Sequence, residues 1–279
     1  MLTADDIAAH PRALVLLRGQ AAAFLALERG SPRAAAVFGT QQRYLLAQLA
    51  LSMSFRSPDG TLILSRFLKA VVERGVASRN TAHDFVREME RYGLGIVESS
   101  PGDRRAKPLR LGEEPKRLIA MWLAIHLRTL DAFDGGARAA ALEARPDLLT
   151  AIHPLIVDRI FASRHATRPE GTFSLFTWMN DGGLVMDKMI ATIEDFDADD
   201  RRIVTGIESL DVLGEALRVT KTHLSRKMAE AEREQSLGWT GRRGRSRLWL
   251  SPAFLDEYVA YQADKLARID DAYGEASLL

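Results

Sequence analysis

The chain has 279 residues, of which 47% are hydrophobic and 27% charged, and its formal net charge is +1. This composition excludes a disordered chain, and the small net charge excludes a polycation that binds nucleic acid through its overall charge. The absence of cysteine excludes disulfides, thiolate zinc sites and cysteine nucleophiles. No apolar run reaches the roughly 18 residues of a membrane span, and no basic segment precedes an apolar one at the N-terminus, so we expect a cytoplasmic protein with no membrane partner.

The first half of the chain predicts a series of helices followed by a hairpin and a closing helix. Apolar residues recur at spacings of three and four, and Thr40 and Ser78 are suited to cap the helices that follow them. The helix that begins at residue 5 is expected to kink or to begin anew at His10-Pro11. The expected helices, in chain order, span residues 5–28, 41–54, 64–73, 79–92 and 115–133. Strands at 96–98 and 109–111 are expected to form the hairpin.

After Asp134-Gly135-Gly136 the second half predicts the same order of elements. Its expected helices span residues 147–162, 172–179, 184–193, 210–217 and 221–235, and a last one opens at Ser251-Pro252. Its hairpin strands are expected at 237–239 and 248–250. Four pairs of landmarks lie between 139 and 143 positions apart: the His-Pro pairs at 10 and 153, the caps Ser78 and Thr220, Leu109 and Leu248, and Asp131 and Asp271. We therefore predict an internal duplication with units at residues 1–136 and 137–279.

The stretch from Leu210 to Met228 is typical of a helix-turn-helix. A short apolar helix, a tight turn and a capped helix leave one polar face, whose residues are Lys221, Thr222, His223, Ser225, Arg226 and Lys227. Such side chains reach base edges and phosphates in the major groove. The same pattern also describes an ordinary amphipathic helix with a solvated face, and the hairpin that follows favours DNA.

That hairpin carries four arginines among glycines and serine: Arg242, Arg243, Arg245 and Arg247. Crowded like charges repel one another, so stability alone gives no reason for them, whereas closely spaced phosphates would offset the repulsion. A loop kept soluble by its charge is the alternative reading.

The first unit presents a parallel set of candidates for DNA binding. They are Arg79, Asn80, Thr81, His83 and Arg87 on the helix, and Arg104, Arg105 and Lys107 on the hairpin. Arginine and asparagine are suited to bidentate contacts with guanine and adenine. However, Asp84 would repel a phosphate, and together with Glu88 and Glu90 it leaves open a docking role for this unit.

The hairpin segment Pro101–Leu111, with the sequence PGDRRAKPLRL, resembles the wing of the MarR family of bacterial regulators. In that family an Asp-x-Arg pair stabilises the wing and places arginine at the minor groove, and Asp103 and Arg105 match this pair. The resemblance implies a mainly α fold with two tandem winged helix-turn-helix units, each with a small β-hairpin wing, arranged as a pseudo-dimer. Its recognition helices would enter successive major grooves roughly 34 Å apart. The second hairpin has Gly-Arg-Ser-Arg and no such aspartate.

The resemblance further implies a small aromatic effector. Candidates to line its pocket are Trp122, Phe133, Phe173, Phe176, Trp178 and Met179. At helical spacing these residues also fit an ordinary core, and the sequence leaves the two readings open.

Enzymatic motifs are absent from the sequence. No His-Glu-x-x-His, glycine-rich phosphate loop or Gly-x-Ser-x-Gly occurs, and the acidic cluster at 194–200 lacks the EF-hand pattern. His126 lies on an apolar face and is interpreted as a core residue. We therefore expect no enzyme, no catalytic residues, no metal and no cofactor.

The sequence thus predicts a regulator of transcription that binds double-stranded DNA in a sequence-specific manner. Because the faces RNTAHDFVRE and KTHLSRKMAE differ, one chain is expected to read an imperfectly palindromic site. The alternative is a winged-helix protein–protein scaffold in which only the second unit binds DNA. Either a monomeric pseudo-dimer or a homodimer is compatible with the sequence.

Overall fold

Helices make up most of the computed structural model, which describes residues 1–30, 39–98, 107–167, 170–194, 201–215 and 217–278. The elements of the first half are α1 (Ala4–Ala8), α2 (Ala13–Gly30), α4 (Gln41–Phe55), β1 (Thr61–Ile63), α5 (Leu64–Glu73), α6 (Arg79–Arg91), β2 (Gly95–Val97), β3 (Pro108–Leu111) and α7 (Glu113–Asp134). Those of the second half are α8 (Arg138–Ala144), α9 (Leu148–Ala162), α10 (Arg164–Thr167), α11 (Gly171–Thr177), α12 (Gly182–Ala191), β4 (Ile203–Val204), α13 (Leu210–Gly214), α14 (Lys221–Arg233), β5 (Leu237–Trp239), β6 (Leu248–Leu250) and α15 (Pro252–Ala276). The expectation of a mainly α protein is confirmed.

Each half contains a three-stranded antiparallel sheet with the last strand in the middle. The strand orders are β1-β3-β2 and β4-β6-β5. In the first sheet Thr61 pairs with Arg110, and in the second Ile203 pairs with Leu250. The order helix, strand, helix, helix, strand, strand, helix therefore occurs twice along the chain. The outer strands β1 and β4 were not expected from the sequence.

The helix caps expected from the sequence are present. The hydroxyls of Thr40, Ser78, Thr220 and Ser251 each accept a hydrogen bond from the backbone N–H three residues later. Such a cap satisfies one of the free N–H groups at a helix N-terminus and contributes about 1 kcal/mol. The caps thereby fix where α4, α6, α14 and α15 begin.

One landmark of the expected repeat is wrong. His10-Pro11 lies at the break between α1 and α2, whereas His153 and Pro154 lie inside α9. The break that corresponds to His10-Pro11 is the one between α8 and α9, which contains Arg145-Pro146. The duplication is better marked by α6 and α14, since both helices have 13 residues and begin 142 positions apart.

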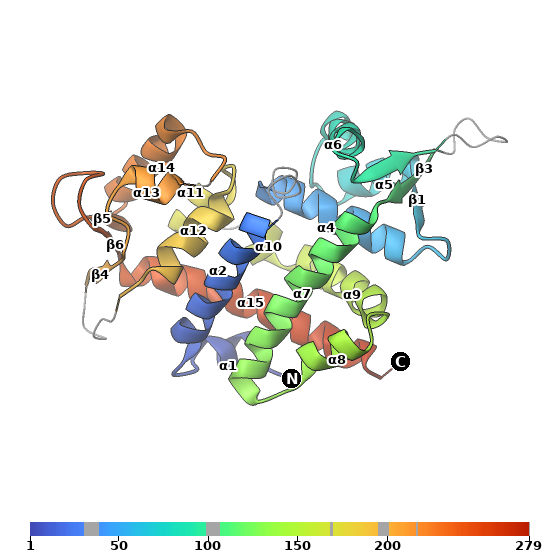
Figure 1. Cartoon of the computed structure of the whole chain (residues 1–279), viewed down its shortest axis with the longest axis horizontal. Coiled ribbons are helices and arrows are strands. Elements are labelled where there is room, and N and C mark those ends of the chain that lie inside the picture. The colour runs from blue at the N-terminus through green and yellow to red at the C-terminus, as the bar shows by residue number, and fades with distance from the viewer. Residues whose placement is uncertain (31–38, 99–106, 168–169, 195–200, 216, 279) are drawn as a thin grey trace.

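Helices of each half pack against helices of the other half. Helix α2 packs against α12 of the second half as well as α7, and α9 packs against α4 of the first half as well as α15. In the same reciprocal way α1 packs on α15 and α8 packs on α7. Figure 1 shows α15 running across the molecule, with α2 and α7 side by side and crossing it.

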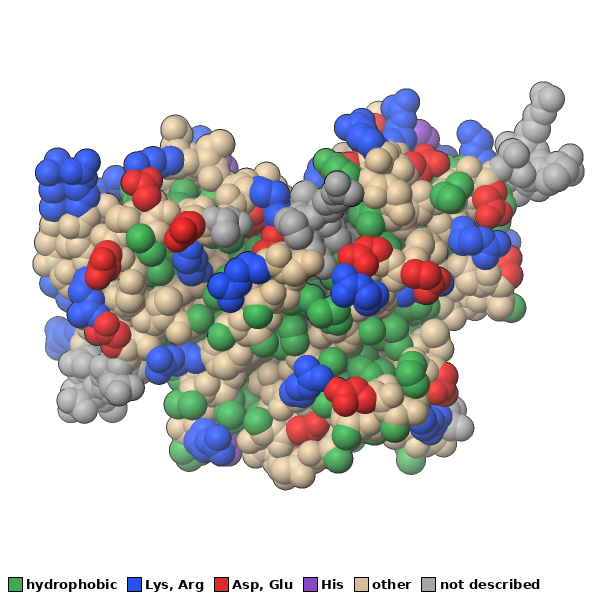
Figure 2. All heavy atoms as spheres, in the orientation of Figure 1, with side chains coloured by type: hydrophobic (Ala, Val, Ile, Leu, Met, Phe, Trp, Pro, Cys, Tyr) green, Lys and Arg blue, Asp and Glu red, His purple; other side chains and the backbone are tan. Residues whose placement is uncertain are grey.

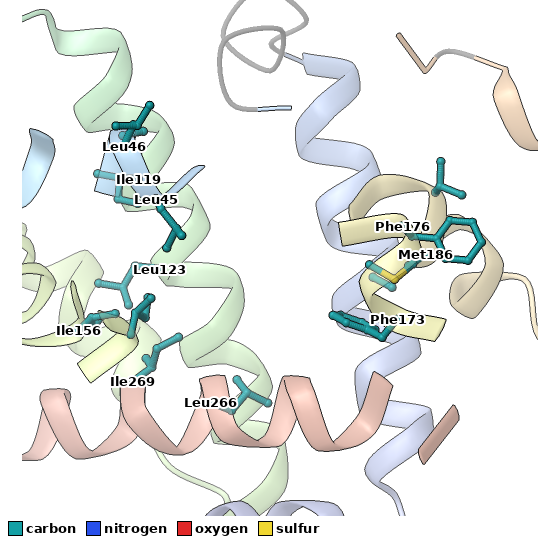
Figure 3. Packing of buried hydrophobic residues seen from close by; sticks show 14 of the residues in the cluster. Leu45, Leu46, Ile119, Leu123, Ile156, Phe173, Phe176, Met186, Leu266 and Ile269 are labelled. Atoms are coloured by element: carbon teal, nitrogen blue, oxygen red, sulfur yellow. The ribbon is translucent and has the colours of Figure 1, made fainter. Parts of the chain in front are cut away.

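The hydrophobic core is continuous across the boundary expected at residues 136 and 137. Its buried apolar side chains form one cluster that extends from Ile7 to Ala276. Figure 3 shows Leu123 of α7 close to Ile156 of α9 and Ile269 of α15. Burial of each such side chain stabilises the fold by about 1.5–3 kcal/mol, so the core couples the two halves. The division into units at 1–136 and 137–279 stays a prediction about the sequence repeat.

Among the helices that the structure describes, none has both the length and the apolar character needed to cross a membrane.

Candidate nucleic-acid interface

Helix α6 is amphipathic, and the candidate residues that the sequence places on this helix lie on its outer face. Its inner face consists of Ala82, Phe85, Val86 and Met89, which are buried. The helix packs against α5 and β2 through this face. All five predicted side chains are exposed, namely Arg79, Asn80, Thr81, His83 and Arg87, and so are Asp84, Glu90 and Arg91.

Helix α14 repeats this arrangement in the second unit. Leu224, Met228 and Ala231 are buried, and the helix packs against α13, α11 and β5. Of the six predicted residues, Lys221, Thr222 and Arg226 are exposed, while His223, Ser225 and Lys227 are half-buried. The half-buried residues therefore have less surface to offer a ligand than the sequence pattern indicated.

The two helices lie along the same edge of the molecule. In Figure 1 α6 and α14 occupy the upper edge, opposite α1 and α8. Figure 2 shows Lys and Arg side chains gathered over both helices, with acidic side chains among them. This edge is the surface at which one extended ligand could contact both halves.

Two lysines of α14 form ion pairs within their own unit. Lys221 Nζ lies 2.7 Å from Asp211 of α13, and Lys227 Nζ lies 2.9 Å from Glu230. The side chains of Lys221 and Asp211 are 66% and 73% exposed, so their pair contributes less than about 1 kcal/mol and can exchange for another anion.

The second hairpin is a closed, internally hydrogen-bonded loop. The N–H of Arg245 donates to the carbonyl of Arg242 across a turn, at 3.0 Å, and Gly244 has φ 69 at the third turn position. A positive φ at that position favours glycine. The N–H of Gly241 donates to Oγ of Ser246 at 2.9 Å, which closes the loop from the other side.

Two of the four hairpin arginines have partners within the protein. Nε of Arg243 lies 2.9 Å from both carboxylate oxygens of Glu232 on α14, and its Nη2 donates to the carbonyl of Ser225 at 2.9 Å. Arg247 pairs with Glu194. The sequence offered no stabilising role for the four arginines. That interpretation is wrong for Arg243 and Arg247, because their ion pairs hold the hairpin against its own unit.

Arg242 and Arg245 differ from these two. Both side chains are exposed, and neither forms an ion pair with any residue that the structure describes. They are the two arginines of this hairpin best placed to contact an external anion.

In the first unit, Arg104 and Arg105, together with Asp103, lie outside the described residues. Lys107 is described and exposed. Arg110 of β3 pairs with Glu98 at 3.0 Å and donates to the carbonyl of Asp59 at 3.1 Å. Arg110 therefore links the edges of the first sheet.

The glutamates of α6 have structural roles that the sequence did not reveal. Glu88 accepts two hydrogen bonds from Arg43 of α4, at 3.2 and 2.6 Å. Glu90 accepts from the backbone N–H of Val97 in β2 at 3.0 Å. Glu232 occupies the equivalent position on α14 and accepts from Nε1 of Trp239 in β5 at 2.9 Å. Both units thus use the same helix position to hold the helix against its hairpin.

The six aromatic and methionine candidates for an effector pocket do not share one site. Trp122 and Phe173 line a cavity between the halves. Phe176 and Met179 are buried core residues, Trp178 is 50% exposed, and Phe133 packs edge-on against His10. The cavity is also lined by polar residues, among them Asp187 of α12 and Lys265 of α15. The sequence pattern did not indicate them, because these two helices meet only in the folded chain.

The buried histidines are packed in the core, as expected for His126. Burial lowers the pKa of His126 well below its usual value, and that of His153 to about 3. Nε2 of His153 bonds Oε1 of Gln48 at 2.7 Å, which joins α9 to α4. Within the described residues no group of three or more His, Asp or Glu side chains could hold a metal ion.

Comparisons were made with protein-family models, with curated proteins and with solved structures. None of the three finds a match. The resemblance to the MarR family thus stays a prediction from the residues of the sequence.

Proposed function

We propose that this protein regulates transcription by binding double-stranded DNA through two tandem winged helix-turn-helix units on one chain. The second helix of each pair, α6 or α14, would enter the major groove, and the hairpin after it would act as the wing. The observation that carries the proposal is the repeated order of elements, with a capped 13-residue helix in each half whose polar face lies on one shared edge.

The electrostatics of that edge also support DNA as the ligand. The formal net charge of +1 is too small to hold a polyanion, so attraction must come from local groups of cations. Arg79 and Arg87 on α6, Arg226 on α14, and Arg242 and Arg245 on the second hairpin provide exposed guanidinium groups there.

A single chain of this kind would read two different half-sites. The helices begin 142 positions apart, so Asn80 corresponds to Thr222 and Asp84 to Arg226. Since the contacting side chains differ, the preferred site is expected to be asymmetric, unlike the palindrome read by a symmetric homodimer.

Site selection from random duplex DNA, followed by affinity measurements at several salt concentrations, tests the proposal. The full chain is expected to enrich one sequence. Each phosphate contact contributes about 0.9 to the slope of log K against log salt, so Arg242→Ala/Arg245→Ala is expected to flatten that slope by about two units. The matched control Arg128→Ala/Arg145→Ala removes two exposed arginines near α8, on the opposite edge, and is expected to keep the original slope. Failure of the full chain to enrich any sequence would overturn the proposal.

A protein–protein scaffold in which only the second unit binds DNA is the second candidate. Three large apolar side chains of the first unit are exposed and favour this reading: Val72, Tyr92 and Ile96, at 50%, 43% and 66%. Three acidic residues of α6 left this reading open from the sequence. Two of them, Glu88 and Glu90, no longer favour it, because each accepts hydrogen bonds from its own unit. Changing the first face (Arg79→Ala, Asn80→Ala and Arg87→Ala) separates the candidates: a loss of affinity favours two DNA readers, and unchanged affinity favours the scaffold.

A further inference from the structure

In each unit, an arginine beside the turn of the helix pair forms an ion pair with a helix of the opposite half. Arg74, the C-cap of α5, pairs with Asp158 of α9, and its guanidinium carbon lies 4.9 Å from the ring centre of Phe161 in the same helix. Arg218, two residues before the N-cap of α14, pairs with Glu28 of α2. Helices α2 and α9 occupy equivalent places, since α2 packs on α12 and α9 packs on α4. The two arginines thus make comparable links across the halves, and the links can be compared directly.

The link of the second unit is buried and has two carboxylates. Nη2 of Arg218 lies 2.6 Å from Oε1 of Glu28 and 3.1 Å from Oδ1 of Asp181. The backbone N–H of Arg218 donates to Oδ2 of the same aspartate at 2.5 Å. Only 13% of the Glu28 side chain and 1% of the Asp181 side chain are exposed. Removal of the cation from such a buried group is strongly destabilising, so this link is expected to stay closed.

Asp181 connects the turn before α14 to both halves of the chain. It is the N-cap residue of α12, but its side chain binds Arg218 and does not cap that helix. Its backbone N–H donates to the carbonyl of Gly39, just before α4, at 2.7 Å. Its φ of 52 lies in the left-handed region, which is unfavourable for a residue with a side chain. The contacts on both sides therefore hold this aspartate in one conformation.

A lysine of α12 anchors the other end of the same turn. Nζ of Lys188 donates to the carbonyl of Val212 and, at 3.1 Å, to that of Glu215, both at the end of α13. Helix α13 has five residues, whereas α5 has ten. A helix this short satisfies few of its own carbonyls, so the lysine of the neighbouring helix supplies the missing donor. The turn before α14 is thus held by charged side chains at both of its ends.

The link of the first unit is exposed and shared. Nη2 of Arg74 lies 3.5 Å from Oδ1 of Asp158, and 36% and 48% of the two side chains are exposed. The same aspartate also binds Arg56, at 2.6 Å. Exposed pairs contribute little to stability and weaken further in salt. A contact within the first half anchors the turn itself, since the carbonyl of Val76, which corresponds to Arg218, accepts from Nε2 of Gln42 at 3.0 Å.

We infer that α14 is held at a fixed position against the opposite half, with Arg218 as its positioning residue, and that the first unit moves more freely. The chain then reads DNA with one fixed and one adjustable unit. A change in the separation of the two half-sites is accommodated by the first unit. This consequence for reading rests on the proposed function, whereas the difference in rigidity does not.

Distances between pairs of spin labels test the difference in rigidity in the absence of DNA. Because the chain has no cysteine, labels attach only at cysteines that are introduced. Arg91→Cys and Arg233→Cys mark the exposed last residues of α6 and α14, and Glu143→Cys provides an exposed reference on α8, at the opposite edge. The distance from α8 to α6 is expected to have a broader distribution than the distance from α8 to α14.

Two arginine variants test whether the links cause this difference. Arg218→Met is expected to broaden the distribution between α8 and α14 to about the width of the other one. Arg74→Met is the matched control and is expected to leave both distributions unchanged, because its pair is exposed. Should Arg218→Met fail to fold because Asp181 loses its cation, Glu28→Gln replaces it, since it keeps the side-chain shape and removes the charge of α2. Equal widths in the native chain, or no broadening in the variant that folds, would overturn the inference.

Affinity for the selected DNA site with one base pair inserted between its half-sites tests the consequence for reading. The insertion moves one half-site by about 3.4 Å along the duplex and by about a tenth of a turn. The native chain and Arg74→Met are expected to lose affinity about 10-fold, as for a mismatched base pair, and Arg218→Met only about 3-fold. An equal loss in all three would contradict a fixed second unit. If no DNA sequence is enriched at all, the proposed function fails, and the label distances still decide the difference in rigidity.

Discussion

Arg138 of α8 donates from Nε to Oδ1 of Asp270 in α15 at 2.8 Å, and only 12% and 3% of these side chains are exposed. The same guanidinium binds Asp131 and Asp134 at the end of α7, at 3.1 and 2.6 Å. Asp270 also accepts from the backbone N–H of Leu2 at 2.7 Å. One arginine thus joins the end of the first half to the last helix of the second, and these carboxylates raise its pKa.

Arg138→Met is expected to lower the free energy of unfolding by about 3–5 kcal/mol. The variant leaves Asp270 buried without its cation, and breaking one side of a buried pair costs that much. Urea denaturation at pH 7 measures the loss. Arg128→Met is the matched control, because its pair with Glu143 is 60% and 62% exposed and contributes less than about 1 kcal/mol. Equal losses in the two variants would contradict the role of Arg138.

The C-terminal ends of α6 and α14 have the same geometry but different residues. Gly93 has φ 70 and Gln235 has φ 57, and they occupy equivalent positions. Each backbone N–H donates to a carbonyl three residues earlier, at 3.0 and 3.1 Å. A left-handed conformation costs a residue with a side chain about 1–2 kcal/mol, so the second unit contains a strained position where the first has none.

Gln235→Gly is expected to raise the free energy of unfolding by about 0.5–1 kcal/mol. The relief of left-handed strain exceeds the cost of the added freedom of glycine in the unfolded chain. Gly93→Gln is expected to lower stability by a similar amount, and open space within 4 Å of Gly93 rules out a steric clash as the reason. Thermal and urea unfolding of the two variants check the pair, and a loss of stability in Gln235→Gly would contradict the argument.

Local signals predicted the helices better than any other part of the fold. Helix α5 was expected over 64–73 and is observed as Leu64–Glu73, because its apolar spacing and Gly75 both mark its end. Helix α13 was expected to reach residue 217 and ends at Gly214, so the apolar residue Leu217 belongs to the turn that follows. Strands β1 and β4 pair with strands more than 40 positions later, Thr61 with Arg110 and Ile203 with Leu250, so no hairpin turn in the sequence marks them.

The candidate interface was predictable where it depends on one helix, and unpredictable where it depends on contacts between elements. The exposed face of α6 follows from helical periodicity, which the sequence contains. The pairing of Arg243 with Glu232 does not follow from periodicity, because it requires the hairpin to fold back on α14. The cavity around Lys265 was missed for the same reason, since its residues come from six helices.

The stability of the protein is expected to decrease as the pH falls below 6.5, and His153 is one cause. Burial lowers the pKa of His153 from 6.5 to about 3 in the folded state, so the unfolded chain takes up this proton first. Stability that is fully present above pH 6.5 is therefore lost progressively as the pH falls toward 3. At pH 4.5 this one group accounts for about 2–3 kcal/mol.

His153→Gln keeps a hydrogen-bonding group beside Gln48 and removes the titration. Urea unfolding at pH 7 and pH 4.5 is expected to show a smaller difference for this variant than for the native chain, by about 2 kcal/mol. His126 is also buried with a lowered pKa, so some pH dependence of the same sign should remain. An unchanged difference between the two pH values would contradict the assignment to His153.

Exchange of the outer face of α6 tests whether the two helices read different sequences. The variant replaces exposed residues with those 142 positions later: Arg79→Lys, Asn80→Thr, Thr81→His, His83→Ser and Asp84→Arg. The buried residues Ala82, Phe85, Val86 and Met89 are kept, so the fold should be retained. Because the first turns of both faces then offer the same donors and acceptors to base edges, selection from random DNA is expected to yield a more symmetric site than the native chain selects. A variant that binds with native affinity and selects an unchanged asymmetric site would show that α6 does not read bases, and would assign sequence recognition to α14 alone.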